Sequence, residues 1–176
     1  MHTLLVVAHP RRSSLTMQVA DRARSRLEAA GSTVDFLDLD AEGFDPRMTP
    51  EDEPDSTDPH KVYSADVHAH MRRLEAADDI VIIFPVWWYG LPALLKGWID
   101  RVWNHGFAYG TRTLTSRLTG KRVLWLGLAG GRKNAFTRSG VLGLLEQQLT
   151  AGISRYSGIE DATARPTTRL ITEQPL

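Results

Sequence analysis

Four short apolar runs constrain the fold of this chain more than any other feature of its sequence. Each run is a nearly continuous series of β-branched or aliphatic residues, without the polar and apolar alternation of a half-exposed strand. Such runs are typical of strands that are covered on both faces, as in a parallel sheet. The runs span Thr3–Ala8, Thr33–Leu39, Asp79–Phe84 and Arg122–Leu128.

Helical patterns lie between these runs. Apolar residues at three- and four-residue spacing predict a helix over Ser14–Ala30, with Ser13 or Ser14 as its N-cap and Gly31 as its C-cap. A broad, aromatic-rich stripe predicts a second helix over 91–103, directly after the third run. Because strands and helices alternate, we expect a single three-layer α/β domain over residues 1–176, with a parallel sheet and right-handed crossovers.

Two segments depart from this alternation. Residues 42–60 carry four prolines and seven carboxylates with hardly any apolar residue. We expect a solvated surface loop there, although its acidity would also suit a partner site. A complete sheet would take a fifth strand and a closing helix from residues 158–176. These residues are weakly apolar, so the sequence does not establish which elements form at this edge of the sheet.

The stretch Ile80–Leu95 is long and apolar enough to raise the question of a membrane span. Pro85, Gly90 and Pro92 interrupt it, so a buried strand that runs into a helix is the better interpretation, with Pro92 in the first helical turn. The N-terminus has no basic region and too short an apolar run for a signal peptide. These features predict a cytoplasmic protein without direct membrane insertion.

Charge and cysteine content exclude several functions. The 21 Lys and Arg residues balance the 21 Asp and Glu residues, so no global field attracts nucleic acid. With no cysteine, the chain has no disulfides, no thiolate catalysis and no cysteine-ligated metal. The histidines lack metal-ligand spacing, so we expect no metal site; redox chemistry would need an organic cofactor.

The loop after the first run has the composition of an anion site. His9–Thr16 is short and polar and leads into a helix N-terminus, where backbone N–H groups and the helix dipole favour a phosphate. Arg11 and Arg12 add positive charge. Serine capping with two solvated arginines is an equally simple interpretation. The loop contains neither the P-loop motif nor the Rossmann glycine pattern.

Two further loops follow the third and fourth runs. The first, Phe84–Pro92, carries three adjacent aromatic residues that cannot all point into the core. The second, Leu128–Asn134, contains paired glycines that leave backbone amides accessible to a ligand. Because the carboxyl ends of parallel strands share one edge, the three loops would meet there. A flat aromatic ring with a phosphate tail, such as flavin mononucleotide (FMN), fits such an edge.

Three stretches of the sequence form a pattern that extends beyond the individual loops: Ala8-His-Pro10, the whole of Leu74–Trp103, and Gly106-Phe-Ala-Tyr-Gly110. This pattern resembles the flavodoxin-like NAD(P)H:quinone oxidoreductases. The short bacterial branch, which includes ancillary reductase subunits of glutathione-gated potassium efflux systems, is the most similar. The resemblance implies a flavodoxin-like α/β/α sandwich with strand order 2-1-3-4-5. It also implies non-covalent FMN or FAD, two-electron reduction of quinones with nitroaromatic or azo side substrates, and a homodimer with its active site at the interface.

The resemblance also assigns residues to the flavin and the substrate. The phosphate would be held by His9, Ser13, Ser14, Leu15 and Thr16. The isoalloxazine ring would be lined by Pro85, Val86, Trp87, Trp88 and Tyr89. The polar edge of the ring would be bound by Ala129, Gly130 and Gly131. The substrate would contact Trp88, Tyr89 and Phe136. Trp98 and Trp103 would help to bury the dimer contact.

Two departures from the animal members matter. Their Tyr and His, proposed to relay charge after the glycine pair, correspond to Phe136 and Leu142, so that relay cannot operate. Their extra C-terminal region, which helps to hold the adenine of FAD, is absent, which favours FMN over FAD. Arg132 and Lys133 could bind a 2′-phosphate and so select NADPH, or they could be solvated.

No side chain is certain to be catalytic, because the cofactor carries the chemistry. Hydride would pass from a nicotinamide to the flavin and then to a quinone in a ping-pong cycle. The N–H groups of Gly130 and Gly131 would meet the negative charge on the reduced ring. Tyr89 could hydrogen-bond the substrate or serve only as a wall. The rival interpretations are a flavin-binding regulatory subunit of a transporter and a flavodoxin-type one-electron carrier.

Overall fold

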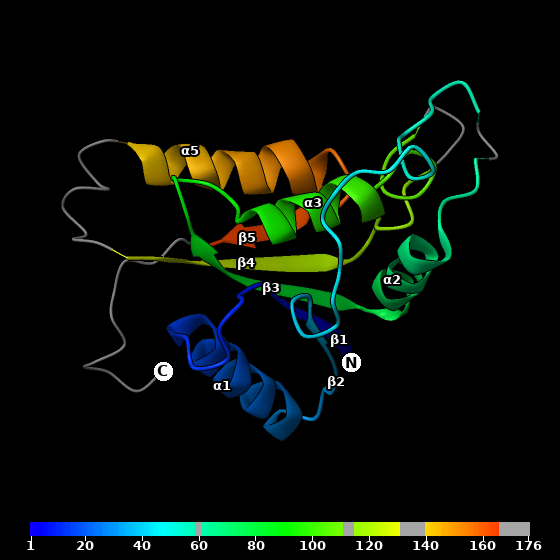
Figure 1. Cartoon of the computed structure of the whole chain (residues 1–176). Helices are drawn as coiled ribbons and strands as arrows, with labels where there is room; N and C mark the ends of the chain where they lie inside the picture. Colours follow the sequence, from blue (N-terminus) through cyan, green and yellow to red (C-terminus); the bar gives the residue numbers. More distant parts are fainter. Residues whose placement is uncertain (59–60, 111–114, 131–139, 166–176) are drawn as a thin grey trace.

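Five parallel strands form one sheet in a computed structural model that describes residues 1–58, 61–110, 115–130 and 140–165. The sheet order is β2-β1-β3-β4-β5, which confirms the predicted topology and the fifth strand (Figure 1). The strands are β1 (His2–Val7), β2 (Thr33–Asp38), β3 (Asp79–Val86), β4 (Arg122–Ala129) and β5 (Asp161–Ala164). Strand β3 runs two residues beyond its predicted end, through Pro85, and it pairs with β4 as far as Val86 and Ala129.

Helices cover both faces of the sheet, as the sandwich fold requires. In Figure 1, α1 lies on one side, with α3 and α5 on the other. The helices are α1 (Leu15–Ala29), α2 (Ala65–Ala76), α3 (Ala93–Val102), α5 (Val141–Gln147) and a π-helix η1 (Gln148–Arg155) that continues α5. In the described ranges, no helix is both long and apolar enough to cross a bilayer.

The structure corrects two predicted helix ends. Pro92 is the N-cap of α3 rather than part of its first turn, since its backbone is extended. Ala30 is the C-cap of α1, and Gly31 follows with a φ of +84°, a left-handed conformation that glycine adopts without strain. The N-cap of α1 is Ser14, whose hydroxyl accepts a hydrogen bond from the N–H of Met17 at 3.2 Å.

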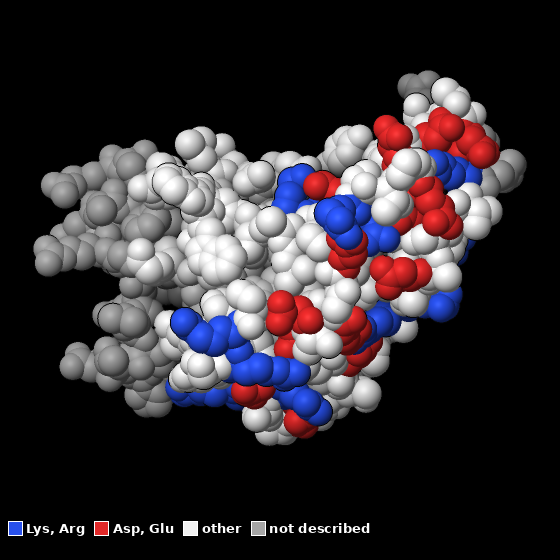
Figure 2. All heavy atoms as spheres, viewed as in Figure 1, with Lys and Arg blue, Asp and Glu red and all other residues white. Residues whose placement is uncertain are grey.

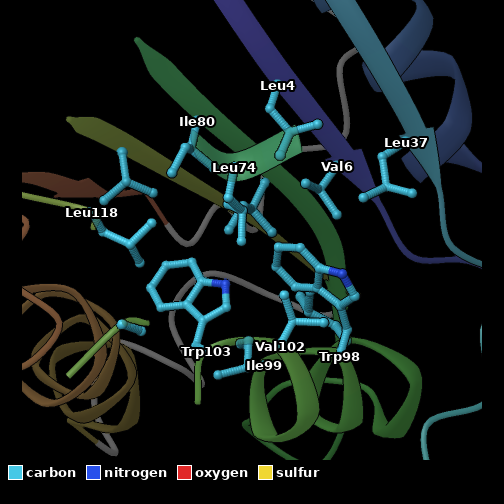
Figure 3. Packing of buried hydrophobic residues seen from close by; sticks show 14 of the residues in the cluster. Leu4, Val6, Leu37, Leu74, Ile80, Trp98, Ile99, Val102, Trp103 and Leu118 are labelled. Atoms are coloured by element: carbon cyan, nitrogen blue, oxygen red, sulfur yellow. The ribbon is translucent and has the colours of Figure 1, made fainter. Parts of the chain in front are cut away.

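The larger core lies between the sheet and helices α2, α3 and α5. Figure 3 shows Trp98 of α3 and Trp103, the C-cap of this helix, among aliphatic side chains that include those of the strands. Trp98 is fully buried and Trp103 is 4% exposed. The expectation that these two residues help to bury a dimer contact is therefore wrong, because the core of their own protomer already covers them.

The acidic segment is not simply a solvated loop. Asp52 is buried and accepts hydrogen bonds from the backbone N–H of Ser64 at 2.8 Å and from Nη2 of Arg101 at 2.7 Å. Burial alone would raise the pKa of Asp52, but these hydrogen bonds outweigh it and lower the pKa below its ordinary value. Residues 42–58, which we call the acidic strap, are thus fixed to α3.

Other carboxylates of the strap stay on the surface. Figure 2 shows acidic side chains gathered at the end of the molecule where the strap lies. Phe44, in contrast, is buried, with its ring 5.0 Å from the guanidinium carbon of Arg101. The strap is therefore anchored by two buried side chains, Phe44 and Asp52, while most of its other residues are exposed. Its exposed acidic tip keeps the composition that suggested a solvated loop.

Candidate functional site

The carboxyl ends of β1, β3 and β4 meet at one edge of the sheet. β3 lies between β1 and β4, and the register pairs Val7 with Ile83 and Val86 with Ala129. The first two predicted loops are in contact, because the rings of His9 and Trp87 lie 5.8 Å apart, edge to face. The loop that begins at Gly130 leaves the neighbouring strand. The common edge is also where strand order reverses, the usual ligand position in such sheets.

The first loop is folded tightly onto the start of α1. The backbone N–H of Arg11 donates to Nδ1 of His9 at 3.0 Å, and the N–H of Ser14 donates to the carbonyl of Arg11 at 3.1 Å. Ser14 and Thr16 are buried, while Leu15 is 37% exposed. The first turn of a helix presents N–H groups that lack intrahelical acceptors, so this loop can bind an anion.

The charged residues of this loop are not equivalent. Arg12 pairs with Asp38 at the end of β2, with 3.4 Å between Nη1 and Oδ2. Burial, and then the positive charge of Arg11, lower the pKa of His9 below its ordinary value. A neutral His9 that accepts through Nδ1 carries its proton on Nε2, so the ring can donate one hydrogen bond to a ligand oxygen. Asp38 was not among the residues expected at this edge.

The second loop is a tight turn with an unusual backbone. Trp87 and Gly90 exchange two backbone hydrogen bonds, of 3.2 and 3.0 Å. Between them, Trp88 has a φ of +50° and Tyr89 a φ of +61°. Turns with two left-handed central residues normally contain Asn and Gly, and each bulky residue there costs about 1–3 kcal/mol. Strain of this kind is concentrated at functional sites.

This turn exposes a wall of aromatic surface. Trp87 is 45% exposed, Trp88 97% and Tyr89 54%, while Pro85 is buried and Val86 half-buried. The three rings thus behave as predicted, since they do not enter the core. Large exposed aromatic surface normally marks a binding site.

The third loop starts with open space. A Cβ atom built on Gly130 would meet no atom of the described residues within 4 Å, whereas one on Gly127 would lie 3.0 Å from Val86. Gly130 is also exposed, so the backbone of this residue is accessible, as a ring edge would require. Four residues assigned to the site lie outside the described ranges: Gly131, Arg132, Lys133 and Phe136. Leu142, the other relay position, is half-buried in α5.

The three loops together fit a flavin. Their described residues offer a helix start suited to an anion, a tight aromatic wall and an exposed Gly130, which would match a phosphate, a flat ring and its polar rim. A cavity of about 420 Å³ lies elsewhere, at the start of the strands, between charged residues that include Asp79, Arg122 and Asp161. None of its lining residues comes from the three loops. The candidate flavin site is therefore inferred from the geometry of the loops and not from this cavity.

Comparisons with known proteins identify the family and the fold of this chain. Residues 1–170 match the family described as having a flavodoxin-like fold (Flavodoxin_2). An uncharacterized NAD(P)H oxidoreductase of Escherichia coli K12, YcaK, is 44% identical over 158 residues, which cover 90% of this chain and 79% of the relative. The rat NAD(P)H dehydrogenase [quinone] 1 is 30% identical over 177 residues, 89% of this chain and 65% of that protein.

Solved structures are similar as well. The NAD(P)H:quinone oxidoreductase of Methanothermobacter marburgensis superposes with a TM-score of 0.87 at 28% identity, over 94% of this chain and 83% of that one. General stress protein 14 of Treponema denticola in complex with FMN has a TM-score of 0.63 at 22% identity, over 94% and 83% of the two chains, and shows the shared fold.

Proposed function

This chain belongs to the flavodoxin-like NAD(P)H:quinone oxidoreductase family, and from that membership we propose that it binds FMN and reduces quinones with NAD(P)H. The observation that carries the proposal is the strained turn at Trp88 and Tyr89, whose exposed aromatic wall lies beside the anion-binding loop through the contact between His9 and Trp87. A backbone that holds two bulky residues in a left-handed conformation needs a compensating function, and a wall for a flat ring supplies one.

Each of the three loops would bind a different part of the flavin. The first turn of α1 and the loop before it would hold the phosphate through N–H groups, the Ser13, Ser14 and Thr16 hydroxyls and His9. Pro85–Tyr89 would line the ring, and Ala129–Gly131 would hold its polar edge. When bound, FMN supplies the two-electron hydride chemistry. The protein would orient the reacting rings and exclude water, and the backbone N–H groups at Gly130 and Gly131 would stabilise negative charge at the polar edge.

We also propose that the site is completed by a second copy of the chain. The Trp88 side chain is 97% exposed, and so large an uncovered indole at the wall calls for a partner surface. The exposed side chains of Tyr156 and Leu144 add further apolar surface on α5 and beyond η1. A homodimer would cover this surface and leave the substrate between two protomers.

The visible spectrum of the purified protein tests the cofactor, and the mass of the released compound separates FMN from FAD. Steady-state turnover with NADH or NADPH and a soluble quinone then tests the reaction. A yellow protein without turnover would favour the regulatory subunit, and a protein that exchanges only single electrons with its partners would favour the carrier. A colourless protein that stays colourless after incubation with FMN and FAD would refute the proposal.

A further inference from the structure

His9 contacts both the first loop, before α1, and the aromatic turn that contains Trp87. Its Nδ1 accepts the backbone N–H of Arg11 at 3.0 Å within the anion-binding loop. Its ring lies 5.8 Å from that of Trp87 at an interplanar angle of 63°. His9 is thus a side chain through which the loop that would hold a phosphate contacts the turn that would hold a ring.

The contact restrains both partners. The hydrogen bond from Arg11 fixes the orientation of the imidazole, and the N–H of Ala8 donates to the carbonyl of Ile83, which ties the end of β1 to β3. Trp87 is 45% exposed, so solvent faces much of its indole and the His9 ring restrains the indole from one side. Edge-to-face aromatic pairs prefer a narrow range of geometries, so the His9 ring selects one orientation of the indole.

From this contact we infer that His9 is a positioning residue for the aromatic wall as well as a ligand of the phosphate. His9 holds Trp87 in the orientation that accepts the isoalloxazine ring, so ring binding depends on His9 even when the flavin has no phosphate. This inference rests on the proposed function, because it concerns the same flavin site. It differs from a phosphate-only role in one measurable respect, the affinity for riboflavin.

Two variants of His9 separate the two halves of the contact. His9→Asn keeps an acceptor near the position of Nδ1 for the Arg11 N–H but removes the ring. His9→Phe keeps a ring beside Trp87 but removes the acceptor. The dissociation constants of FMN and of riboflavin are measured for each apoprotein by quenching of flavin fluorescence, and thermal unfolding checks that each variant is folded.

We expect His9→Asn to weaken riboflavin binding about three- to tenfold, in the range of one aromatic pair, and to weaken FMN binding by at least that factor. His9→Phe should keep riboflavin affinity within about twofold, since the ring contact remains, and should still weaken FMN binding. In a Trp87→Leu background, His9→Asn should add no further loss of riboflavin affinity, because its partner is already gone.

The outcomes separate the inference from the function on which it rests. Unchanged riboflavin affinity in His9→Asn, or an equal loss with and without Trp87→Leu, would overturn the positioning role and leave the flavin site standing. A wild-type protein that binds neither flavin would overturn the proposed function itself. If His9→Asn does not fold, the riboflavin affinity of His9→Phe tests the inference instead. This variant keeps a ring beside Trp87, so a loss of riboflavin affinity of more than about tenfold would show that the ring contact is not what His9 contributes to ring binding.

Discussion

Gly97 of α3 lies directly against Pro46 of the acidic strap, and a Cβ atom at Gly97 would overlap the Pro46 carbonyl oxygen. A glycine inside a helix normally costs about 1 kcal/mol relative to alanine. Here the missing side chain is what lets the strap lie across the helix. The close approach of these two residues explains why a helix of the main core contains a glycine.

Gly97→Ala should therefore destabilise the protein by about 1–3 kcal/mol, because overlap with Pro46 outweighs the gain in helix propensity. Gly143→Ala in α5 is the matched control, since a Cβ there meets no atom of the described part of the chain within 4 Å. That control should be neutral or stabilise by up to about 1 kcal/mol in the same urea-unfolding experiment. If Gly97→Ala instead stabilises the protein, Pro46 and the strap around it can shift away from α3 at little cost in free energy.

Two ion pairs on α3 should differ sharply in their contribution to stability. Arg101 is buried against Asp52, so Arg101→Met leaves a buried carboxylate without its partner and should cost about 3–5 kcal/mol. Lys96 pairs with Asp100 on the solvent side, and Lys96→Met should cost less than about 1 kcal/mol. Equal losses in denaturant unfolding would contradict the burial of the strap pair.

The strained turn should trade stability against activity. Tyr89→Gly relieves a left-handed tyrosine, and we expect a gain of about 1 kcal/mol in unfolding free energy together with a lower kcat/KM for quinone. Tyr89→Phe keeps both the ring and the left-handed backbone and removes only the hydroxyl group. If Tyr89→Phe also lowers kcat/KM, the hydroxyl group contributes to turnover. An unchanged kcat/KM would assign Tyr89 to the aromatic wall alone.

The two arginines of the first loop should differ in their effect on phosphate binding. Arg12 is already paired with Asp38, whereas the charge of Arg11 acts on His9 inside the loop. We expect Arg11→Ala to weaken FMN binding about tenfold, the size of a charge-assisted hydrogen bond, and to leave riboflavin binding unchanged. Arg12→Ala should have the smaller effect. The dissociation constants of FMN are measured by fluorescence titration. A larger loss of FMN affinity in Arg12→Ala than in Arg11→Ala would indicate that the phosphate binds nearer to Arg12.

His70 should make stability fall in mild acid. Burial lowers the pKa of His70, with Asp66 opposing that shift, so the unfolded chain takes up a proton near pH 6.5 before the folded chain does. The free energy of unfolding should thus decrease as the pH falls below about 6.5, by up to about 1.4 kcal/mol per pH unit for this group, until the lowered pKa is reached. His70→Gln should flatten the urea-unfolding profile between pH 7 and 5; a profile of unchanged slope would exclude His70 as its source.

The strands could be predicted from the sequence because a parallel sheet leaves a local signal. Continuous apolar runs located four strands to within two residues, and strand order followed from the family resemblance. Helices α2 and α5 were not predicted. The apolar stripe of α2 is sparse, although Ser64 as an N-cap before Val67 and Met71 was a usable signal.

The acidic strap and the aromatic turn could not be read from the sequence, for different physical reasons. The burial of Asp52 depends on Arg101, 49 residues away, and no local pattern reports such a pairing. The turn has Trp and Tyr at the two positions where Asn and Gly would have predicted a left-handed backbone. Its strain is therefore visible only in the φ angles of the structure. The exposure of its rings was predictable, because three adjacent aromatic residues cannot share one buried face.

The buried anchor of the strap also limits how the gene can be engineered. Judged by its prolines and carboxylates alone, the whole connection between β2 and α2 would look like a convenient place to splice in a peptide tag. Phe44, Pro46 and Asp52 make its first part intolerant of added length, because an insertion there would pull these anchors off α3. Residues 53–58, which carry the exposed acidic tip, are where a tag or a fused domain should be accommodated.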